Sequence, residues 1–141
     1  MLVRQVMNKA VVVAKPEVNM KKASEIMSNY HIGSLVISDG KKILGILTGS
    51  DIIKAVAGGR NPEKTLIDTV MTKNVKTIGP NDDIEDAVDL MVKNKIKKLP
   101  VVDEGKLVGI ITVSDIAAIE PKLLSNLTSL ISVKMPGYTG G

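Results

Sequence analysis

Two short clusters of hydroxyl and carboxylate side chains contain the residue types that bind sugars and phosphates. They are Thr48, Ser50 and Asp51 in the first cluster and Thr112, Ser114 and Asp115 in the second. Each cluster lies between two apolar runs, which predicts a buried strand that ends where a helix begins. A helix N-terminus presents unpaired backbone N–H groups and the positive end of the helix dipole, and both attract anions. The clusters are therefore candidate anion or nucleotide sites.

The same residues have a second interpretation as helix caps. Thr48 precedes Asp51 by three residues, which is the outline of a capping box, and the second cluster has the same spacing. Each cluster nevertheless holds more polar groups than one cap needs, and a carboxylate can accept from both hydroxyls of a ribose. Two copies do not separate the interpretations, because duplicating a repeat also duplicates its caps. Gly45 and Gly109, before the clusters, have a purely structural reading too, in which they permit close strand packing.

The two clusters belong to an internal duplication. Residues 6–53 align with residues 70–117 without a gap, at an offset of 64, with 17 identities in 48 positions. Unrelated segments would match at about one position in twenty, and two long copies favour a pseudo-symmetric pair over a solenoid array.

Each repeat predicts the order strand–helix–strand–strand–helix, which is an α/β unit. The short apolar run over 11–14 predicts the first strand of the first repeat, and its counterpart in the second repeat is residues 75–78, before Gly79-Pro80. Apolar residues at helical spacing then predict helices capped by Asn19 and Asp83. The remaining strands form predicted hairpins over 34–48 and 98–112. Such a unit is too small to bury its own sheet, so we expect the two repeats to pack together.

The rest of the chain is divided around these repeats. We assign residues 3–60 to the first repeat, 61–119 to the second with a lead-in helix over 65–71, and 120–141 to a C-terminal extension. Pro121 and the leucines that follow it predict an amphipathic helix, which ends at 135–137 before a frayed end at 140–141. This helix would either cover an exposed edge of the core or contact another subunit, and the sequence favours neither.

Composition excludes several classes of function. The chain has no cysteine and a single histidine, His31, so we expect neither thiol chemistry nor a multi-histidine metal centre. No nucleophile–base pair is visible, so we expect no catalysis. No apolar run approaches the ~20 residues that span a bilayer, and no signal peptide is recognisable. We therefore expect a cytoplasmic protein without membrane contact.

The positive charge is mostly lysine and is unevenly distributed between the repeats. The net charge is +4 and the pI is near 9.3. Lys97 and Lys98 precede a strand of the second repeat, where the first repeat has Gly33 and Ser34. A phosphate would favour this charge, although a solvated helix end would look the same. A basic chain also leaves open a nucleic-acid-binding adaptor, but the two tyrosines offer little platform for stacking bases.

The repeated pattern resembles the CBS domain. In the second repeat it runs through Val70-Met71, Pro80, Leu99-Pro100-Val101-Val102-Asp103 and Gly109-Ile110-Ile111-Thr112-Val113-Ser114-Asp115. Over about residues 3–119 the chain resembles a stand-alone tandem CBS-domain pair. The first repeat departs from the pattern at Val36, where the second has Pro100, and at Gly33-Ser34. The resemblance implies an α/β fold of two pseudo-symmetric β-α-β-β-α repeats packed as a CBS-domain pair, and a homodimer.

The resemblance also implies a regulatory ligand-sensing module rather than an enzyme. Such a module binds adenine nucleotides or related adenosine compounds (AMP, ADP, ATP) in clefts between the repeats, with no catalytic cofactor. Asp51 and Asp115 would hold ribose. Phosphate would be held by Thr48, Ser50, Thr112, Ser114, Lys97, Lys98, Gly33 and Ser34. Ile32 and Lys9 would lie opposite Asp115, with Ile96 and Lys73 opposite Asp51. Because both lysines belong to its repeat, the Asp115 site is expected to bind polyphosphates more tightly.

Two alternatives to ligand sensing stay open at this point. A nucleic-acid adaptor would bind RNA or DNA with an affinity that falls steeply with salt. A structural assembly module would have empty sites and would use the C-terminal helix as its interaction surface. The physiological adenosine compound and the regulated target do not follow from the sequence.

Overall fold

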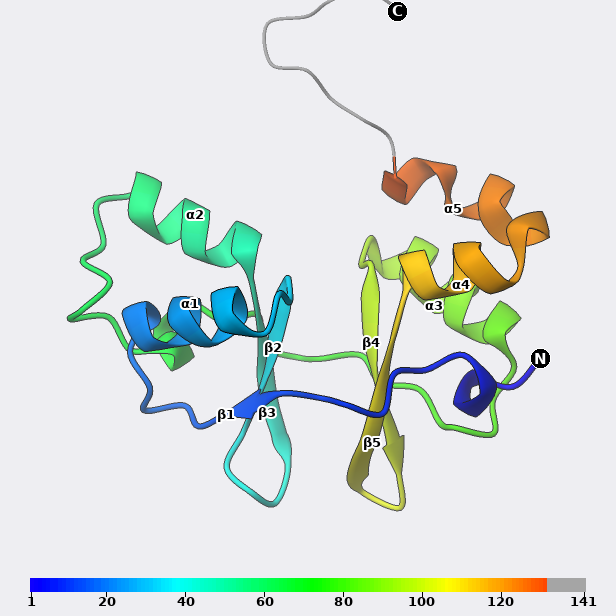
Figure 1. The fold of residues 1–141 in the computed structure, drawn as a ribbon, viewed down its shortest axis with the longest axis horizontal. Coiled ribbons are helices and arrows are strands. Elements are labelled where there is room, and N and C mark those ends of the chain that lie inside the picture. Colours follow the sequence, from blue (N-terminus) through cyan, green and yellow to red (C-terminus); the bar gives the residue numbers. More distant parts are fainter. Residues whose placement is uncertain (132–141) are drawn as a thin grey trace, which may run out of the picture.

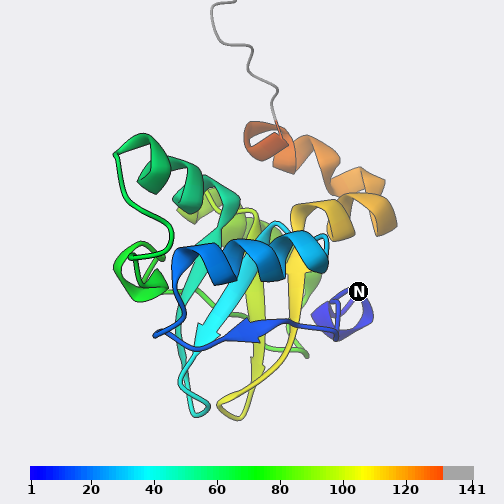
Figure 2. The ribbon, with the colours of Figure 1, turned by 60° about the vertical axis from the view of Figure 1, so that its left-hand side comes forward.

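Two similar halves lie side by side, and each is an antiparallel hairpin with helices at the same end (Figure 1). The computed structural model describes residues 1–131. The first half contains β1 (Val13–Ala14), α1 (Met20–Asn29), β2 (Ser34–Ser38), β3 (Ile43–Thr48) and α2 (Gly49–Ala57). The second contains α3 (Ile84–Asn94), β4 (Lys98–Asp103), β5 (Lys106–Thr112), α4 (Val113–Ile119), η3 (Pro121–Leu123) and α5 (Leu124–Ile131). The predicted α/β fold of two repeats is confirmed, and both hairpin tips point away from the helices (Figure 2).

The helices α1 and α3 begin at the predicted caps. Asn19 Oδ1 accepts a hydrogen bond from the backbone N–H of Lys22 at 2.8 Å, and Asp83 Oδ1 accepts one from Glu85 at 3.2 Å. Each bond satisfies an N–H that has no partner inside the helix. Behind the caps, the predicted apolar stripes are buried: Met20, Ala23 and Met27 in α1, and Ile84, Ala87, Val88 and Met91 in α3. The methionines therefore fill the core, as predicted.

The first strand of each repeat is shorter than predicted. The predicted strands cover residues 11–14 and 75–78. The first is reduced to the two residues of β1, parallel to β2, and the second to a single parallel bridge at Ile78. Pro100 explains the difference between the repeats. In the first half the Val36 N–H donates to the Val12 carbonyl at 3.4 Å, but Pro100 at the matching position has no N–H to donate.

The segment that precedes each repeat packs into the core of the other half. The 3-10 helix η1 (Val3–Gln5) buries Val3 in the core of the second half, and η2 (Ile67–Thr69) buries Ile67 in the first. Both are single turns rather than the longer lead-in helix predicted over 65–71. The division of the sequence into residues 3–60, 61–119 and 120–141 stays a prediction. In space the two lead-in segments are exchanged, because each packs against the half that does not contain the repeat it precedes.

Two glycines allow these exchanged segments to approach the strands closely. Thr72 forms a bridge with β3, and a Cβ on Gly45 would lie 2.6 Å from the sulfur of Met71. The second half repeats the arrangement, because a Cβ on Gly109 would lie 2.7 Å from the sulfur of Met7. Real Cβ contacts are not this short. The glycines therefore accommodate the exchanged segment.

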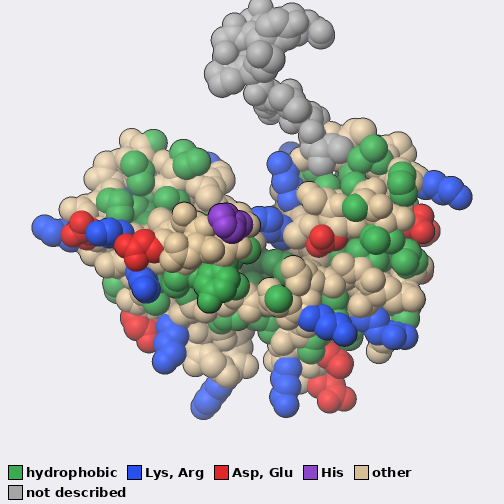
Figure 3. Space-filling model, viewed as in Figure 1, with side chains coloured by type: hydrophobic (Ala, Val, Ile, Leu, Met, Phe, Trp, Pro, Cys, Tyr) green, Lys and Arg blue, Asp and Glu red, His purple; other side chains and the backbone are tan. Residues whose placement is uncertain are grey.

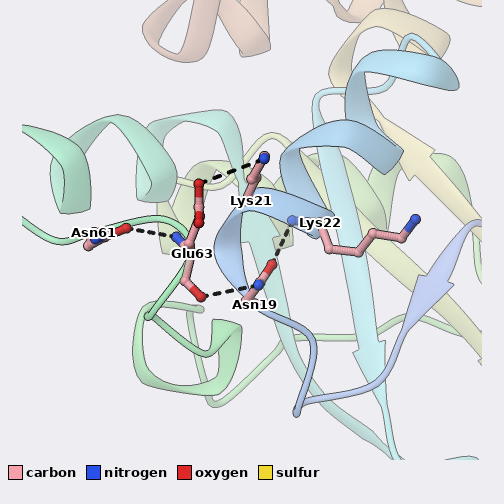
Figure 4. Close-up of polar contacts among 5 residues, drawn as sticks. All are labelled: Asn19, Lys21, Lys22, Asn61 and Glu63. Atoms are coloured by element: carbon pink, nitrogen blue, oxygen red, sulfur yellow. Dashed lines mark hydrogen bonds and ion pairs between the residues drawn. The ribbon is translucent and has the colours of Figure 1, made fainter.

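Polar contacts fix the linker between the halves to the start of α1 (Figure 4). The Asn19 side chain caps α1 by accepting a hydrogen bond from the Lys22 N–H, and it also donates one to the Glu63 carbonyl at 3.2 Å. Lys21 forms an ion pair with Glu63 at 3.8 Å, and the Glu63 N–H donates to Asn61 at 3.0 Å. The linker thus holds η2 against the first half before the chain crosses to the second.

The C-terminal extension covers the core of the second half. Leu127 is fully buried and Leu130 nearly so, both in the same cluster as α3 and α4. Helix α5 packs on α3, and η3 packs on α4. The sequence left two roles open for this helix, and the structure shows that it covers an edge of the core. The predicted helix end at 135–137 and the frayed end at 140–141 lie outside the described residues.

Candidate functional site

Both polar clusters form complete capping boxes. Thr48 Oγ1 accepts from the Asp51 N–H at 3.2 Å, and Asp51 Oδ2 accepts from the Thr48 N–H at 2.9 Å. The same two bonds join Thr112 and Asp115, each at 3.1 Å. Capping is therefore confirmed at α2 and α4, and it occupies one oxygen of each carboxylate.

Capping leaves other polar atoms of the clusters available. Ser50 and Ser114 are exposed, and neither hydroxyl has a hydrogen-bond partner within residues 1–131. Asp115 Oδ1 also lacks a partner in that part of the chain, whereas Asp51 Oδ1 accepts a long hydrogen bond of 3.4 Å from Thr72 Oγ1. Each strand-to-helix junction thus presents a hydroxyl and a carboxylate oxygen that can serve a ligand.

The residues predicted to reach phosphate lie at the same junctions. Ser34 pairs in register with the N-cap threonine of α2, and the Gly33 carbonyl accepts from the first N–H of α2 at 3.2 Å. Lys98 and Lys97 take these positions beside α4, where the Lys97 carbonyl accepts from the first N–H at 2.9 Å. The hairpin pairing therefore unites the parts of each predicted site that lie 14 or more residues apart in the sequence.

The Lys98 side chain crosses from its own half to the other. A Cβ built on Gly33 would lie 3.1 Å from Lys98 Nζ. The side chain is partly buried, and its ammonium has no hydrogen bond or ion pair among the described residues. Burial and, second, the charge of Lys97 lower the pKa of Lys98 below its usual range. Figure 3 shows lysine or arginine side chains at the boundary between the two halves.

A surface groove of about 340 Å³ adjoins the first junction. Asp51 lines it together with Lys54 and Arg60, and the Arg60 guanidinium donates to Thr69 Oγ1 at 2.8 Å. Sequence analysis missed Lys54, Arg60 and Thr72. Lys54 could have been found, because it lies one helical turn after Asp51 on the same helix face. Thr72 reaches Asp51 only through the exchanged lead-in segment, which the sequence did not reveal.

Among the described residues, no hydrogen bond, ion pair or groove joins the remaining predicted residues to Asp51 or Asp115. Lys9 lines a separate groove of about 300 Å³ with Asp103, next to the tip of the β4–β5 hairpin. Lys73 is exposed. Ile32 packs against the core of the first half and Ile96 against that of the second. Roles for these four side chains beside a ligand stay predictions.

The hairpins, caps and exchanged segments define a duplicated α/β module with one polar junction in each half. A family model for the CBS domain matches residues 3–58 and 67–121. The chain therefore belongs to the CBS-domain family, as a pair of CBS domains, and such a pair is a regulatory module. No helix among the described residues combines the length and apolar character needed to cross a bilayer.

Known relatives and solved structures agree with this assignment. An uncharacterized protein of Methanopyrus kandleri is 35% identical over 128 residues, which are 89% of this chain and 65% of that protein, so the chain spans about two thirds of its length. The CBS domain-containing protein YhcV of Bacillus subtilis is 31% identical, with 82% of both chains covered. The crystal structure of the CBS domain pair of protein MJ0100 superposes with a TM-score of 0.77 at 31% identity, over 86% of this chain and 97% of that one. That structure contains 5′-methylthioadenosine and S-adenosyl-L-methionine.

Proposed function

We propose that this CBS-domain pair is a non-catalytic ligand sensor that binds adenosine compounds at its two strand-to-helix junctions. One observation carries the proposal: each junction keeps an exposed serine hydroxyl and one carboxylate oxygen after its capping box is complete. A ribose offers two adjacent hydroxyls to a carboxylate oxygen, and a serine hydroxyl can donate to a phosphate. The two adenosine compounds bound by the MJ0100 domain pair support the same ligand class.

The proposal extends to the candidate ligands, the cell compartment and the assembly. AMP, ADP and ATP are the ligands to test first, and the protein acts in the cytoplasm on a target still to be identified. The proposed non-catalytic role is supported by the contacts of Asp51 and Asp115, neither of which is bonded to a histidine or a second carboxylate within residues 1–131. The module forms a homodimer, as the family resemblance implies.

The test is calorimetric titration of AMP, ADP, ATP and S-adenosylmethionine into the variants Asp51→Asn and Asp115→Asn. An asparagine oxygen can still accept the capping hydrogen bond, but the side chain loses its charge and one acceptor. We expect each variant to weaken one binding event by at least about tenfold, because a hydrogen bond to a charged group contributes more than one tenfold step in affinity.

Asp83→Asn is the matched control, because Asp83 caps α3 away from both junctions. It should retain both binding events. Wild-type affinity in both junction variants, or an equal loss in Asp83→Asn, would contradict the proposed sites.

A further inference from the structure

A second groove, on the outer side of the second half, holds charged side chains that the proposed function does not use. It has a volume of about 300 Å³, and Arg4, Lys9 and Asp103 are its charged residues. Asp103 pairs with Lys106 beside the turn of the β4–β5 hairpin, whereas the Asp115 junction begins at Thr112, about 20 Å away along β5. This outer groove is therefore separate from the junction of its own half.

Backbone hydrogen bonds fix the walls of the outer groove. The exchanged segment that contains η1 is joined to the loop before α3, because the Arg4 N–H donates to the Pro80 carbonyl at 2.9 Å. The same segment is joined to β5, because the Asn8 N–H donates to the Ile110 carbonyl at 2.8 Å. A site whose walls are already held in place loses little conformational entropy when a ligand enters.

The charged groups of the outer groove do not neutralise one another. Arg4, Lys9 and Asp103 are exposed, and none of their side chains has a hydrogen bond or an ion pair within residues 1–131. The groove thus presents two positive groups and one negative group, together with the apolar side chains Met7 and Val108. A small molecule that carries both charges and an apolar part can contact all of these groups at once. The volume lies at the small end of the usual range for small-molecule sites, about 300–1,000 Å³.

The first half does not repeat this distribution of charge. The positions that match the polar residues of the groove at an offset of 64 hold three carboxylates and one lysine: Glu17, Asp39, Asp68 and Lys73. Asp68 takes the place of Arg4. Three carboxylates would repel the anionic group of a ligand. The charge that suits a zwitterion therefore belongs to the second half.

We propose that the outer groove binds a small zwitterion with an aliphatic part, of the chemical class of the free aliphatic amino acids. Arg4 and Lys9 bind the carboxylate of this ligand, and Asp103 binds its ammonium group. A guanidinium suits the carboxylate because it can donate two parallel hydrogen bonds. The inference goes beyond the proposed function and does not depend on it, because neither Asp51 nor Asp115 lines the outer groove.

The first test titrates leucine, valine and methionine while the backbone amide resonances of Asn81 and Val108 are followed by NMR. We expect both resonances to shift. Leucine is then compared with 4-methylpentanoate, which lacks the ammonium group, and with 3-methylbutylamine, which lacks the carboxylate. Each analogue should bind about threefold to fivefold more weakly, because contacts between exposed charges are weak. No response to any of the three amino acids, or equal binding of leucine and either analogue, would overturn the proposal.

The second test assigns each charge to its residue. Arg4→Met should weaken leucine by about threefold to fivefold and leave 3-methylbutylamine unchanged. Asp103→Asn should weaken leucine equally and leave 4-methylpentanoate unchanged. The exposed residues of the controls Lys76→Met and Asp89→Asn do not line the groove, so both variants should bind leucine as the wild type does. Equal losses in the controls would overturn the assignment.

A titration of the same variants with ATP separates this inference from the proposed function. Arg4→Met and Asp103→Asn should bind ATP as the wild type does, because neither residue is part of a junction. A protein that binds leucine in this way but no adenosine compound retains the outer groove and loses the proposed function. The reverse result, ATP binding without a response to the amino acids, overturns the outer groove alone.

Discussion

The two halves of the molecule share their hairpins and capping boxes but differ in what covers their helices. In the second half, α5 and η3 close the surface of α3 and α4, and Leu127 is fully buried there. In the first half no residue of α2 is buried, and 70% of Ile53 is exposed. The comparison shows that duplication preserved the elements that build the junctions, while the outer surfaces and the charges at the boundary diverged.

The largest effect on the free energy of unfolding is expected from a substitution in the core that α5 covers. Leu127→Ala removes a fully buried side chain from the second core and should lower the free energy of unfolding by about 2–5 kcal/mol. Ile53→Ala, at the exposed face of α2, should change it by less than about 0.5 kcal/mol. Urea unfolding monitored by circular dichroism measures both. A similar cost for the two variants would mean that α2 is covered in solution, and sedimentation would then show a larger assembly.

A smaller effect is expected where the exchanged segment meets β3. Gly45→Ala places a methyl group 2.6 Å from the Met71 sulfur and 2.8 Å from the Thr72 carbonyl, so it should cost about 1–3 kcal/mol through overpacking. Gly49→Ala is the matched control, since a Cβ there meets nothing within 4 Å, and a helical alanine should stabilise by up to about 1 kcal/mol. Thermal unfolding distinguishes them. Equal midpoints for the two variants would contradict the close approach of the lead-in segment.

The smallest effect on stability is expected from Lys98, the partly buried charge at the boundary between the halves, and this effect should depend on pH. The pKa of Lys98 is lower in the folded chain than in the unfolded chain, where it is near 10.5, so the unfolded chain holds this proton more firmly. The folded state therefore carries the full penalty below the folded pKa and loses it as pH rises towards 10.5. Lys98→Met should stabilise the protein at pH 7 by less than about 1 kcal/mol, because the ammonium still reaches solvent.

This advantage of Lys98→Met should shrink as the pH approaches 10.5. Unfolding curves at pH 7, 9 and 10.5 measure it, with the exposed Lys76→Met as the control for a plain loss of charge. A difference between Lys98→Met and the wild type that stays constant over this range would show that the ammonium is not penalised by its surroundings.

Local patterns in the sequence were sufficient for most of the elements and for the capping boxes. Hairpin bounds, the caps Asn19 and Asp83 and the apolar stripes follow from side-chain periodicity and from hydrogen bonds between residues close in sequence. The short first strands were overestimated. The length of each first strand depends on pairing with a strand that follows the next helix. In the second repeat, Pro100 has no N–H, so it cannot donate the hydrogen bond that a longer pairing would need.

The sequence by itself determined the duplication, the two capped junctions and the residue types that each junction offers to a ligand. These depend on spacing within a few residues and on identity between the repeats. Only the tertiary structure decided which half each side chain serves: η1 and η2 exchange places, α5 closes one core, and Lys98 lies against Gly33. The physical reason is that these contacts join segments far apart in the chain, where packing space and burial, rather than sequence neighbours, fix the position of a side chain.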